Sequence, residues 1–349
     1  MHIGFAVYLH VCFNRMTHLP PLDSFIVFAP QYKSVIWGGH TIPRLKGEAD
    51  SALPVGESWE VSAIAGSESH VAGGTHDGMS LSELCGLYGE ALLGREVVRR
   101  HGRVFPLLVK LIDAHRDLSI QVHPNDEVAR RLSGPGAKGK SEMWYVVDAR
   151  EGAHIYSGLR APLTPGEYDR RVADNTLLDV VGVYPSHRGQ FYYVPAGTIH
   201  SIGAGNVIAE IQDASDLTYR LYDYGRRDDA GNLRQLHVAQ GRQAIDYEHT
   251  RHIEPTALVT SQTTPGIVTS GTFTADYLKF DTDGAVIDIE SDGASFQIVM
   301  AVEGEIELSL PDGTARMVLP VAHTALIPAC VAACRISGRG AALRVTCPA

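Results

Sequence analysis

The chain has 349 residues, a length that allows two domains, and it carries a formal net charge of −10, which disfavours nucleic acid or an anionic membrane as the main partner. Hydrophobic residues make up 44% of the chain and charged residues 20%, and no apolar run reaches the roughly 18 residues of a membrane-spanning helix. A small anionic substrate is still compatible with this charge, because a local cluster of arginine and lysine can hold a phosphate inside an acidic protein.

The N-terminus and the cysteines give expectations about processing and compartment. Residues 1–15 are apolar but have neither a charged n-region nor a small-residue cleavage site before Met16, so we expect a loose tail or an upstream start. The cysteines form no CxxC pair and are too scattered for a disulfide framework, which predicts reduced thiols and a cytoplasmic location. They are Cys12, Cys85, Cys330, Cys334 and Cys347.

Short β-rich runs separated by glycine, proline and aspartate predict a mainly β fold, a jelly roll or barrel, over residues 16–255. Three helical regions interrupt these runs, and the first opens with Ser80 and Glu83 in a capping-box pattern. The expected helical regions are Ser80–Arg100, Asn125–Leu132 and Thr164–Val181. The expected strands are Val104–Ile112, Glu142–Val147, Gln190–Val194 and Val207–Gln212.

The composition changes over residues 252–266, which are rich in threonine, serine and proline and predict a linker. From residue 256 to residue 349 we expect a second, smaller β domain. Its expected strands include Tyr277–Phe280, Ala285–Ile289, Phe296–Met300, Glu305–Leu310 and Leu343–Thr346.

The most specific local pattern runs from Gly189 to His200 and has the spacing G-x5-P-x-G-x2-H, which resembles the second cupin motif. A strand would end in a Pro-Ala-Gly turn, and the chain would re-enter the sheet with His200 facing the interior of a jelly-roll barrel. An imidazole in that place is a natural metal ligand. The competing interpretation is a turn with an incidental histidine.

Three further residues fit the same metal site. Gln121 and His123 lie two residues apart in a strand-like run, so both can face one ion, and Glu142 begins the next expected strand. Together with His200 they make a mixed nitrogen and oxygen site, which suits zinc or another first-row divalent ion better than calcium or magnesium. Near the C-terminus, Ala325–Cys334 repeats the turn without a histidine, and predicts a degenerate second cupin that binds no metal.

Several segments together resemble type I phosphomannose isomerases of the short bacterial form. They are LSIQVHP, GKSEMWYV, YYVPAGTIHSIGAG and SDLTYRLYDYGR, in that order, with IWGGHTIP, GESWEVSA and PLLVKLIDA before them. The resemblance covers residues 22–250 and is weaker beyond. It implies a cupin fold, a zinc-dependent interconversion of mannose 6-phosphate and fructose 6-phosphate, and one zinc ion held by Gln121, His123, Glu142 and His200. It also implies active-site roles for Ser119, Lys140, Asp216, Arg220 and Arg226.

Isomerisation of this kind moves a proton between C1 and C2 through an enediolate, so an acid–base group is required. The sequence leaves Lys140, Glu210, Asp216 and a zinc-bound water as candidates. Arg220 and Arg226 are the candidates for the phosphate, although both could instead belong to a solvated ion-pair loop. We expect a sugar phosphate as the partner, no nucleic acid and no membrane, and a monomer or weak homo-oligomer.

Two other functions remain open at this point. A metal-dependent cupin dioxygenase usually has two histidines and one carboxylate with open positions for oxygen, and Gln121 as a fourth ligand argues against it. A non-catalytic sugar-phosphate sensor could use the same fold, since fold does not fix function.

Overall fold

The computed structural model describes residues 19–49, 52–227, 231–248, 263–281 and 285–348, and its strands form three antiparallel sheets. The first sheet has the order β1 (Gln31–Lys33), β2 (Glu57–Val61), β3 (Leu107–Ala114), β10 (Asn206–Asp213), β5 (Glu142–Ala149) and β8 (Phe191–Val194). The second has the order β11 (Tyr219–Tyr222), β4 (Ile120–Val122), β9 (His200–Ile202), β6 (His154–Leu159) and β7 (Val181–Pro185).

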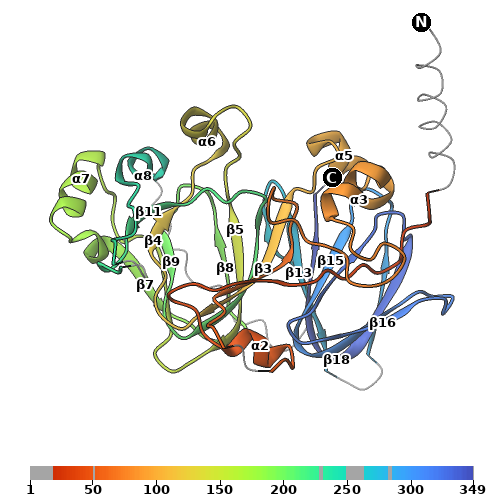
Figure 1. Cartoon of the computed structure of the whole chain (residues 1–349). Helices are drawn as coiled ribbons and strands as arrows, with labels where there is room; N and C mark the ends of the chain where they lie inside the picture. The colour runs from red at the N-terminus through yellow and green to blue at the C-terminus, as the bar shows by residue number, and fades with distance from the viewer. Residues whose placement is uncertain (1–18, 50–51, 228–230, 249–262, 282–284, 349) are drawn as a thin grey trace, which may run out of the picture.

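The third sheet contains the C-terminal strands (Figure 1). Its order is β12 (Thr264–Thr269), β13 (Thr274–Phe280), β18 (Ala333–Thr346), β15 (Gln297–Ser309) and β16 (Arg316–Pro320), with β14 (Val286–Glu290) paired to β18 and β17 (Thr324–Ile327) paired to β15. The mainly β, cupin-type fold is therefore confirmed. In the part of the chain that the structure describes, its jelly roll consists of facing sheets rather than a closed barrel.

The first sheet is the middle layer. Its central strands β3, β10 and β5 are buried on both faces, which is why they read as nearly continuous apolar runs. On β3, Ile112 joins a cluster with Trp144 and with Ile155 of the second sheet. Val109, on the opposite face, joins a larger cluster with Tyr277 of the third sheet. Alternation along one strand thus supplies the core on both sides.

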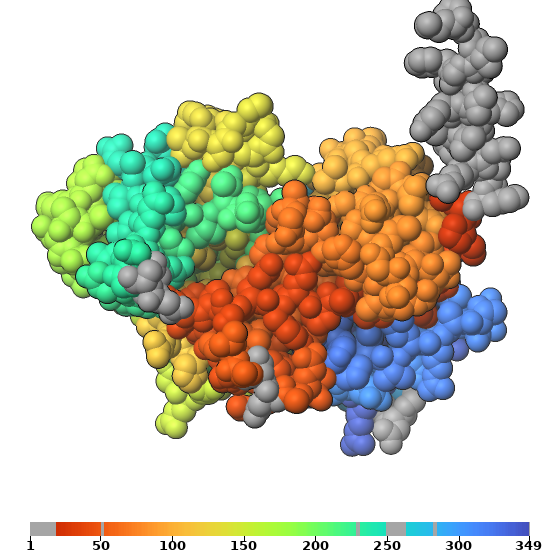
Figure 2. Space-filling model, viewed as in Figure 1, coloured from red at the N-terminus to blue at the C-terminus, as the bar shows by residue number. Residues whose placement is uncertain are grey.

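That larger cluster crosses the domain boundary predicted at residue 256, and the N-terminal segment also reaches the third sheet. Ile26 forms an antiparallel bridge with Leu326, with an N···O distance of 2.8 Å. Phe25 packs against buried side chains of the third sheet. Figure 2 shows the N-terminal residues, in red and orange, lying across the front between the green and the blue parts of the molecule. The proposed division into 16–255 and 256–349 therefore separates segments that share one core.

Helices flank the sheets (Figure 1). Tyr168 of α7 and Ala244 of α8 pack with Ile120 and Leu221 on the outer face of the second sheet. Asn125 caps α6 and Thr164 caps α7, each through its side-chain oxygen, as the predicted starts require. The helices are α2 (Thr41–Leu45), α3 (Leu81–Tyr88), α4 (Glu90–Leu93), α5 (Arg95–His101), α6 (Asp126–Ser133), α7 (Pro165–Ala173) and α8 (Val238–Ala244), with a 3₁₀ turn at Leu177–Val180.

Some boundaries differ from the sequence prediction. The single helical region expected over Ser80–Arg100 keeps its capping box but is broken into α3, α4 and α5, because Gly89 and Gly94 take positive φ angles of 50° and 94°. The two strands expected over residues 296–310 are one long strand, β15, which bends at a register shift between Ala301 and Glu303.

Two predicted features fall on residues 1–18 and 249–262, outside the described part of the chain. They are the N-terminal tail and most of the linker, whose last residues, 264–266, begin β12. The four cysteines within the described residues are all free thiols. No helix of the described residues is long and apolar enough to cross a membrane.

The contact between the start of α5 and the loop that joins β14 to β15 gives a stability prediction. A Cβ on Gly94 would lie 2.3 Å from the carbonyl oxygen of Ala294, at a φ that L-residues rarely adopt. Gly94→Ala should therefore lower the free energy of unfolding by at least about 1 kcal/mol. Gly86→Ala is the matched control, because Gly86 lies inside α3 with no atom within 4 Å of an added Cβ; it should stabilise by about 0.5–1 kcal/mol. Urea unfolding measures both, and equal effects would contradict this view of the α5 contact.

Candidate active site

Three neighbouring strands of the second sheet place three polar side chains in one row. Gln121 on β4 is the register partner of His200 on β9 and of Arg220 on β11. Side chains directly opposite each other on adjacent antiparallel strands share a face of the sheet. His200, Gln121 and Arg220 therefore follow one another across the face that looks toward the first sheet.

His123 and Glu142 join this row from either side. His123 follows β4, and its carbonyl oxygen accepts a hydrogen bond from the N–H of Gly197 at 2.8 Å. Gly197 is the glycine of the Pro-Ala-Gly turn and has a φ of 90°, so the turn that precedes His200 is also fixed against His123. Glu142 is the first residue of β5 and comes from the facing first sheet.

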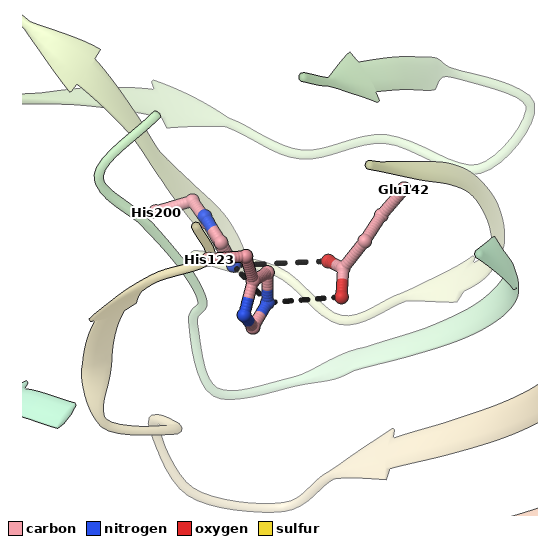
Figure 3. A group of neighbouring side chains, drawn as sticks. All are labelled: His123, Glu142 and His200. Atoms are coloured by element: carbon pink, nitrogen blue, oxygen red, sulfur yellow. Dashed lines mark hydrogen bonds and ion pairs between the residues drawn. The ribbon is translucent and has the colours of Figure 1, made fainter. Parts of the chain in front are cut away.

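The ligand atoms of His123, Glu142 and His200 converge at one point (Figure 3), within 4.8 Å of one another. Glu142 Oε1 lies 3.0 Å from His123 Nε2, and Glu142 Oε2 lies 3.7 Å from His200 Nε2. The two imidazole Nε2 atoms are 3.1 Å apart. The amide nitrogen of Gln121 lies 3.3 Å from His200 Nε2, so a rotation of this amide by about 180° would present its oxygen as a fourth ligand.

The hydrogen bonds on the far side of each ring decide what the Nε2 atoms can do. His123 Nδ1 lies 2.9 Å from the carbonyl oxygen of Leu217, and His200 Nδ1 lies 2.8 Å from that of Thr198. A carbonyl can only accept, so both Nδ1 atoms carry the proton and both Nε2 atoms present lone pairs. Lone pairs that face one another and a carboxylate repel unless a cation lies between them. The residues present therefore fit a divalent metal ion.

Burial and nearby charges keep these groups in the protonation states that bind a metal ion. Burial and the charge of Lys140 lower the pKa of His123 to about 3, and burial also lowers the pKa of His200. Burial alone would raise the pKa of Glu142, but the positive charge of Lys140 and the contact with His123 hold it well below its usual range. Two neutral imidazoles and one carboxylate result, as zinc sites require.

A cavity of 300 Å³ opens beside Gln121 and Glu142. It brings together five of the remaining residues predicted from sequence, which are Ser119, Lys140, Glu210, Asp216 and Arg220. Lys140 Nζ lies 3.0 Å from Glu142 Oε1. Arg226 is placed differently from the prediction, since its guanidinium binds Asp223 and the carbonyl oxygen of Asp117 and does not line the cavity.

Three charged residues of the cavity wall were not predicted from the sequence: Glu57, Lys110 and Arg234. Lys110 is buried, with its Nζ 3.2 Å from Glu210 and 3.5 Å from Glu57. A lone lysine inside the apolar run PLLVKLIDA was a usable signal, because a buried lysine needs an acidic partner. No comparable signal marks Arg234.

Electrostatics divide the roles of these buried groups. Burial opposes the charge of Lys110, but Glu210 and Glu57 raise its pKa above the ordinary value. Lys110 in turn holds the pKa of Glu57 down against burial. Burial and the charge of Glu142 raise the pKa of Glu210 to about 8. The cavity therefore holds a charged Lys110–Glu57 pair beside a carboxyl group, Glu210, whose pKa is raised.

Removing Lys110 tests the importance of this pairing for stability. Lys110→Met would leave the Glu57 carboxylate without its cation, so we expect the free energy of unfolding to fall by about 3 kcal/mol. Lys138→Met is the control, because Lys138 is exposed and should change stability by no more than about 0.5 kcal/mol. Denaturant unfolding of both variants at pH 7 is the measurement. A Lys110 variant as stable as the control would contradict the paired arrangement.

Comparison with known proteins agrees with this geometry. The family model for the catalytic domain of type I phosphomannose isomerase matches residues 26–152. A mannose-6-phosphate isomerase of Streptococcus mutans is 34% identical over 280 residues, which are 80% of this chain and 86% of the relative. The crystal structure of the mannose 6-phosphate isomerase from Bacillus subtilis superposes with a TM-score of 0.77 at 29% identity, covering 93% of this chain and 99% of that one.

A zinc-bound mannose 6-phosphate isomerase structure shares the fold, with a TM-score of 0.75 at 18% identity over 94% of this chain and all of that one. The family resemblance expected from the sequence motifs is thus confirmed by the extent of the match to the Streptococcus mutans relative. The chain belongs to the type I phosphomannose isomerase family.

Proposed function

We propose that this chain is a mannose-6-phosphate isomerase that interconverts mannose 6-phosphate and fructose 6-phosphate. The observation that carries the proposal is the set of buried lone pairs of His123, Glu142 and His200, which adjoins a cavity lined by lysine and arginine. Such a cavity suits a substrate that develops negative charge at one end and carries a phosphate at the other. We also propose a cytoplasmic enzyme that is a monomer or a weak homo-oligomer.

In this proposal one zinc ion is held by Gln121, His123, Glu142 and His200. Nitrogen and oxygen donors without sulfur fit a first-row divalent ion, and zinc is commonly held by four ligands. When bound, the ion supplies positive charge that offsets the negative charge developing on the two oxygens at C1 and C2 of the sugar.

The side chains of the cavity do the remaining work. A proton must move between C1 and C2, and Lys140, Glu210 and Asp216 all line the space where the sugar would lie. Glu210 lines that space with a raised pKa, while Lys140 is held against the ligand Glu142. Ser119 can donate a hydrogen bond to a sugar hydroxyl. Burial of the walls excludes water from the charged intermediate.

Arg220 is the proposed phosphate ligand, and the spacing of the strands gives its distance from the metal site. Arg220 lies two strands from His200, which is about 10 Å at the usual strand spacing. An open-chain hexose phosphate has comparable length, so its reacting carbons can lie at the metal site while its phosphate meets the guanidinium. A planar guanidinium binds phosphate through two parallel hydrogen bonds.

The two alternatives predict different behaviour. A sensor would bind mannose 6-phosphate without converting it, and a dioxygenase would need oxygen. An assay that couples fructose 6-phosphate formation to a second enzyme, run under anaerobic conditions with zinc-loaded protein, decides among them. Conversion without oxygen supports the isomerase, whereas binding without conversion would favour the sensor.

The metal site gives a prediction with two readouts. A chelator should remove the zinc and abolish activity, and added zinc should restore activity. His200→Ala should lose both bound zinc, measured by elemental analysis, and turnover. His115→Ala is the control because His115 is exposed. His237 would be a poor control, since its Nδ1 accepts a hydrogen bond from the backbone N–H of Arg220. A fully active protein without metal would refute the site.

Arg220→Lys tests the phosphate end of the cavity. Lysine keeps the charge but cannot reproduce the planar pair of donors, so kcat/KM should fall at least about tenfold, or about 1.4 kcal/mol. Zinc content and melting temperature should stay near those of the wild type. If Arg220 only braces the loop, through its hydrogen bond of 2.9 Å to the carbonyl oxygen of Gln235, the steady-state kinetics of the variant will match the wild type.

A further inference from the structure

The geometry points to Arg234 as a second guanidinium that binds the substrate phosphate together with Arg220. This inference rests on the proposed function, because it assigns one more residue to the substrate of that same cavity. Arg234 lines the cavity beside Arg220, although it lies in the loop after β11 and in none of the motifs that identify the family.

One end of the Arg234 guanidinium is held by Asp223. Its Nη1 lies 3.3 Å from Oδ1 of Asp223, which is its hydrogen-bonding partner among the described residues. A guanidinium has five N–H donors in a rigid plane, so a single contact leaves most of them available to a ligand. The side chain of Arg234 is 24% exposed, which is enough for access from the cavity and too little for full hydration.

Asp223 is buried and is shared between two arginines. Its Oδ1 also accepts from Arg226 Nε at 3.1 Å. This explains why Arg226, the residue favoured by the sequence, stays outside the cavity: it neutralises Asp223, and Asp223 in turn braces Arg234. Arg226 acts here as a structural partner.

The charge balance of this group favours an anion. Arg220, Arg226 and Arg234 place three positive charges around one aspartate. The mutual repulsion is visible in Arg220, whose pKa is lowered by burial and then by the charge of Arg234. Arg220 Nε is buried and has no hydrogen-bond partner in the described residues. A dianionic phosphate between the two guanidinium groups would satisfy these donors and offset the repulsion.

This arrangement also places the pair at the correct end of the cavity. Arg220 lies beyond Gln121 in the strand row that begins at His200, and Gln235, the residue after Arg234, is held to Arg220 by a hydrogen bond. The two guanidinium groups therefore belong to the end of the cavity away from His200. Phosphorylated sugars would gain from both of them, and free sugars from neither.

The experiment uses inorganic phosphate as the probe and the zinc-loaded full chain as the protein. Calorimetry should show phosphate binding to the wild type and at least tenfold weaker binding to Arg234→Met. Arg242→Met is the matched control, because Arg242 forms an exposed ion pair with Asp169 outside the cavity; it should bind like the wild type. Unchanged affinity in Arg234→Met, or no binding by the wild type, would overturn the assignment.

Kinetics give the second readout. In Arg234→Met the KM for mannose 6-phosphate should rise by the same factor as the phosphate dissociation constant, while kcat stays within about twofold, because uniform binding is lost. Should the methionine variant fail to fold, Arg234→Lys serves instead and should show an intermediate loss; wild-type affinity in that variant would count against Arg234.

The two proposals fail in distinguishable ways. A wild type that binds phosphate through Arg234 but does not convert mannose 6-phosphate would refute the isomerase and leave the anion site. A wild type that converts mannose 6-phosphate, with Arg234→Met unchanged in KM and in phosphate affinity, would refute the role of Arg234 alone.

Discussion

The structure depends on a cluster of buried acceptors that lies between two sheets. His123 and His200 point their Nε2 lone pairs at each other across 3.1 Å, with the carboxylate of Glu142 3.0 Å from the former. Without a cation these groups repel, and with one they attract it together. Because Glu142 comes from the first sheet and the histidines from the second and the turn beside it, the same ion would join the two facing layers.

The middle sheet offsets the free-energy cost of burying these polar groups. β3 sends Val109 and Leu111 into the large core shared with the third sheet, and sends Lys110 toward the cavity. On this strand, the polar side chain Lys110 thus lies on the face that lines the cavity. Lys110 stays charged because the Glu57 carboxylate lies beside it, so the cavity wall is polar without leaving its ammonium group unpaired. The apolar face opposite supplies the burial that stabilises the layer.

The sequence contained most of the metal site, because strand alternation and a turn motif are local signals. Gln121 and His123 share a face by spacing, and His200 follows a turn that requires Gly197. The cavity wall was harder to predict. In the sequence, Lys110 is a single charged residue in an apolar strand, and only the fold shows that Glu57 and Glu210 lie beside it. Arg226 ends a segment of the family resemblance and Arg234 lies outside all of them, so the sequence favoured Arg226. The fold shows that Asp223 binds both arginines and that Arg234, not Arg226, lines the cavity. The break in the helix at Gly94 likewise depends on contact with Ala294, two hundred residues away.

The bridge between Ile26 and Leu326 has a consequence for how the chain folds as it is made. At about 5–20 residues per second, the ribosome needs about 15–60 s to synthesise the segment between them. During that time Phe25 and the apolar face of the first sheet that packs against the third sheet are both uncovered, since the strands that cover them are made last. Contacts of such long range also slow folding. The nascent catalytic half therefore exposes apolar surface until the last strands emerge.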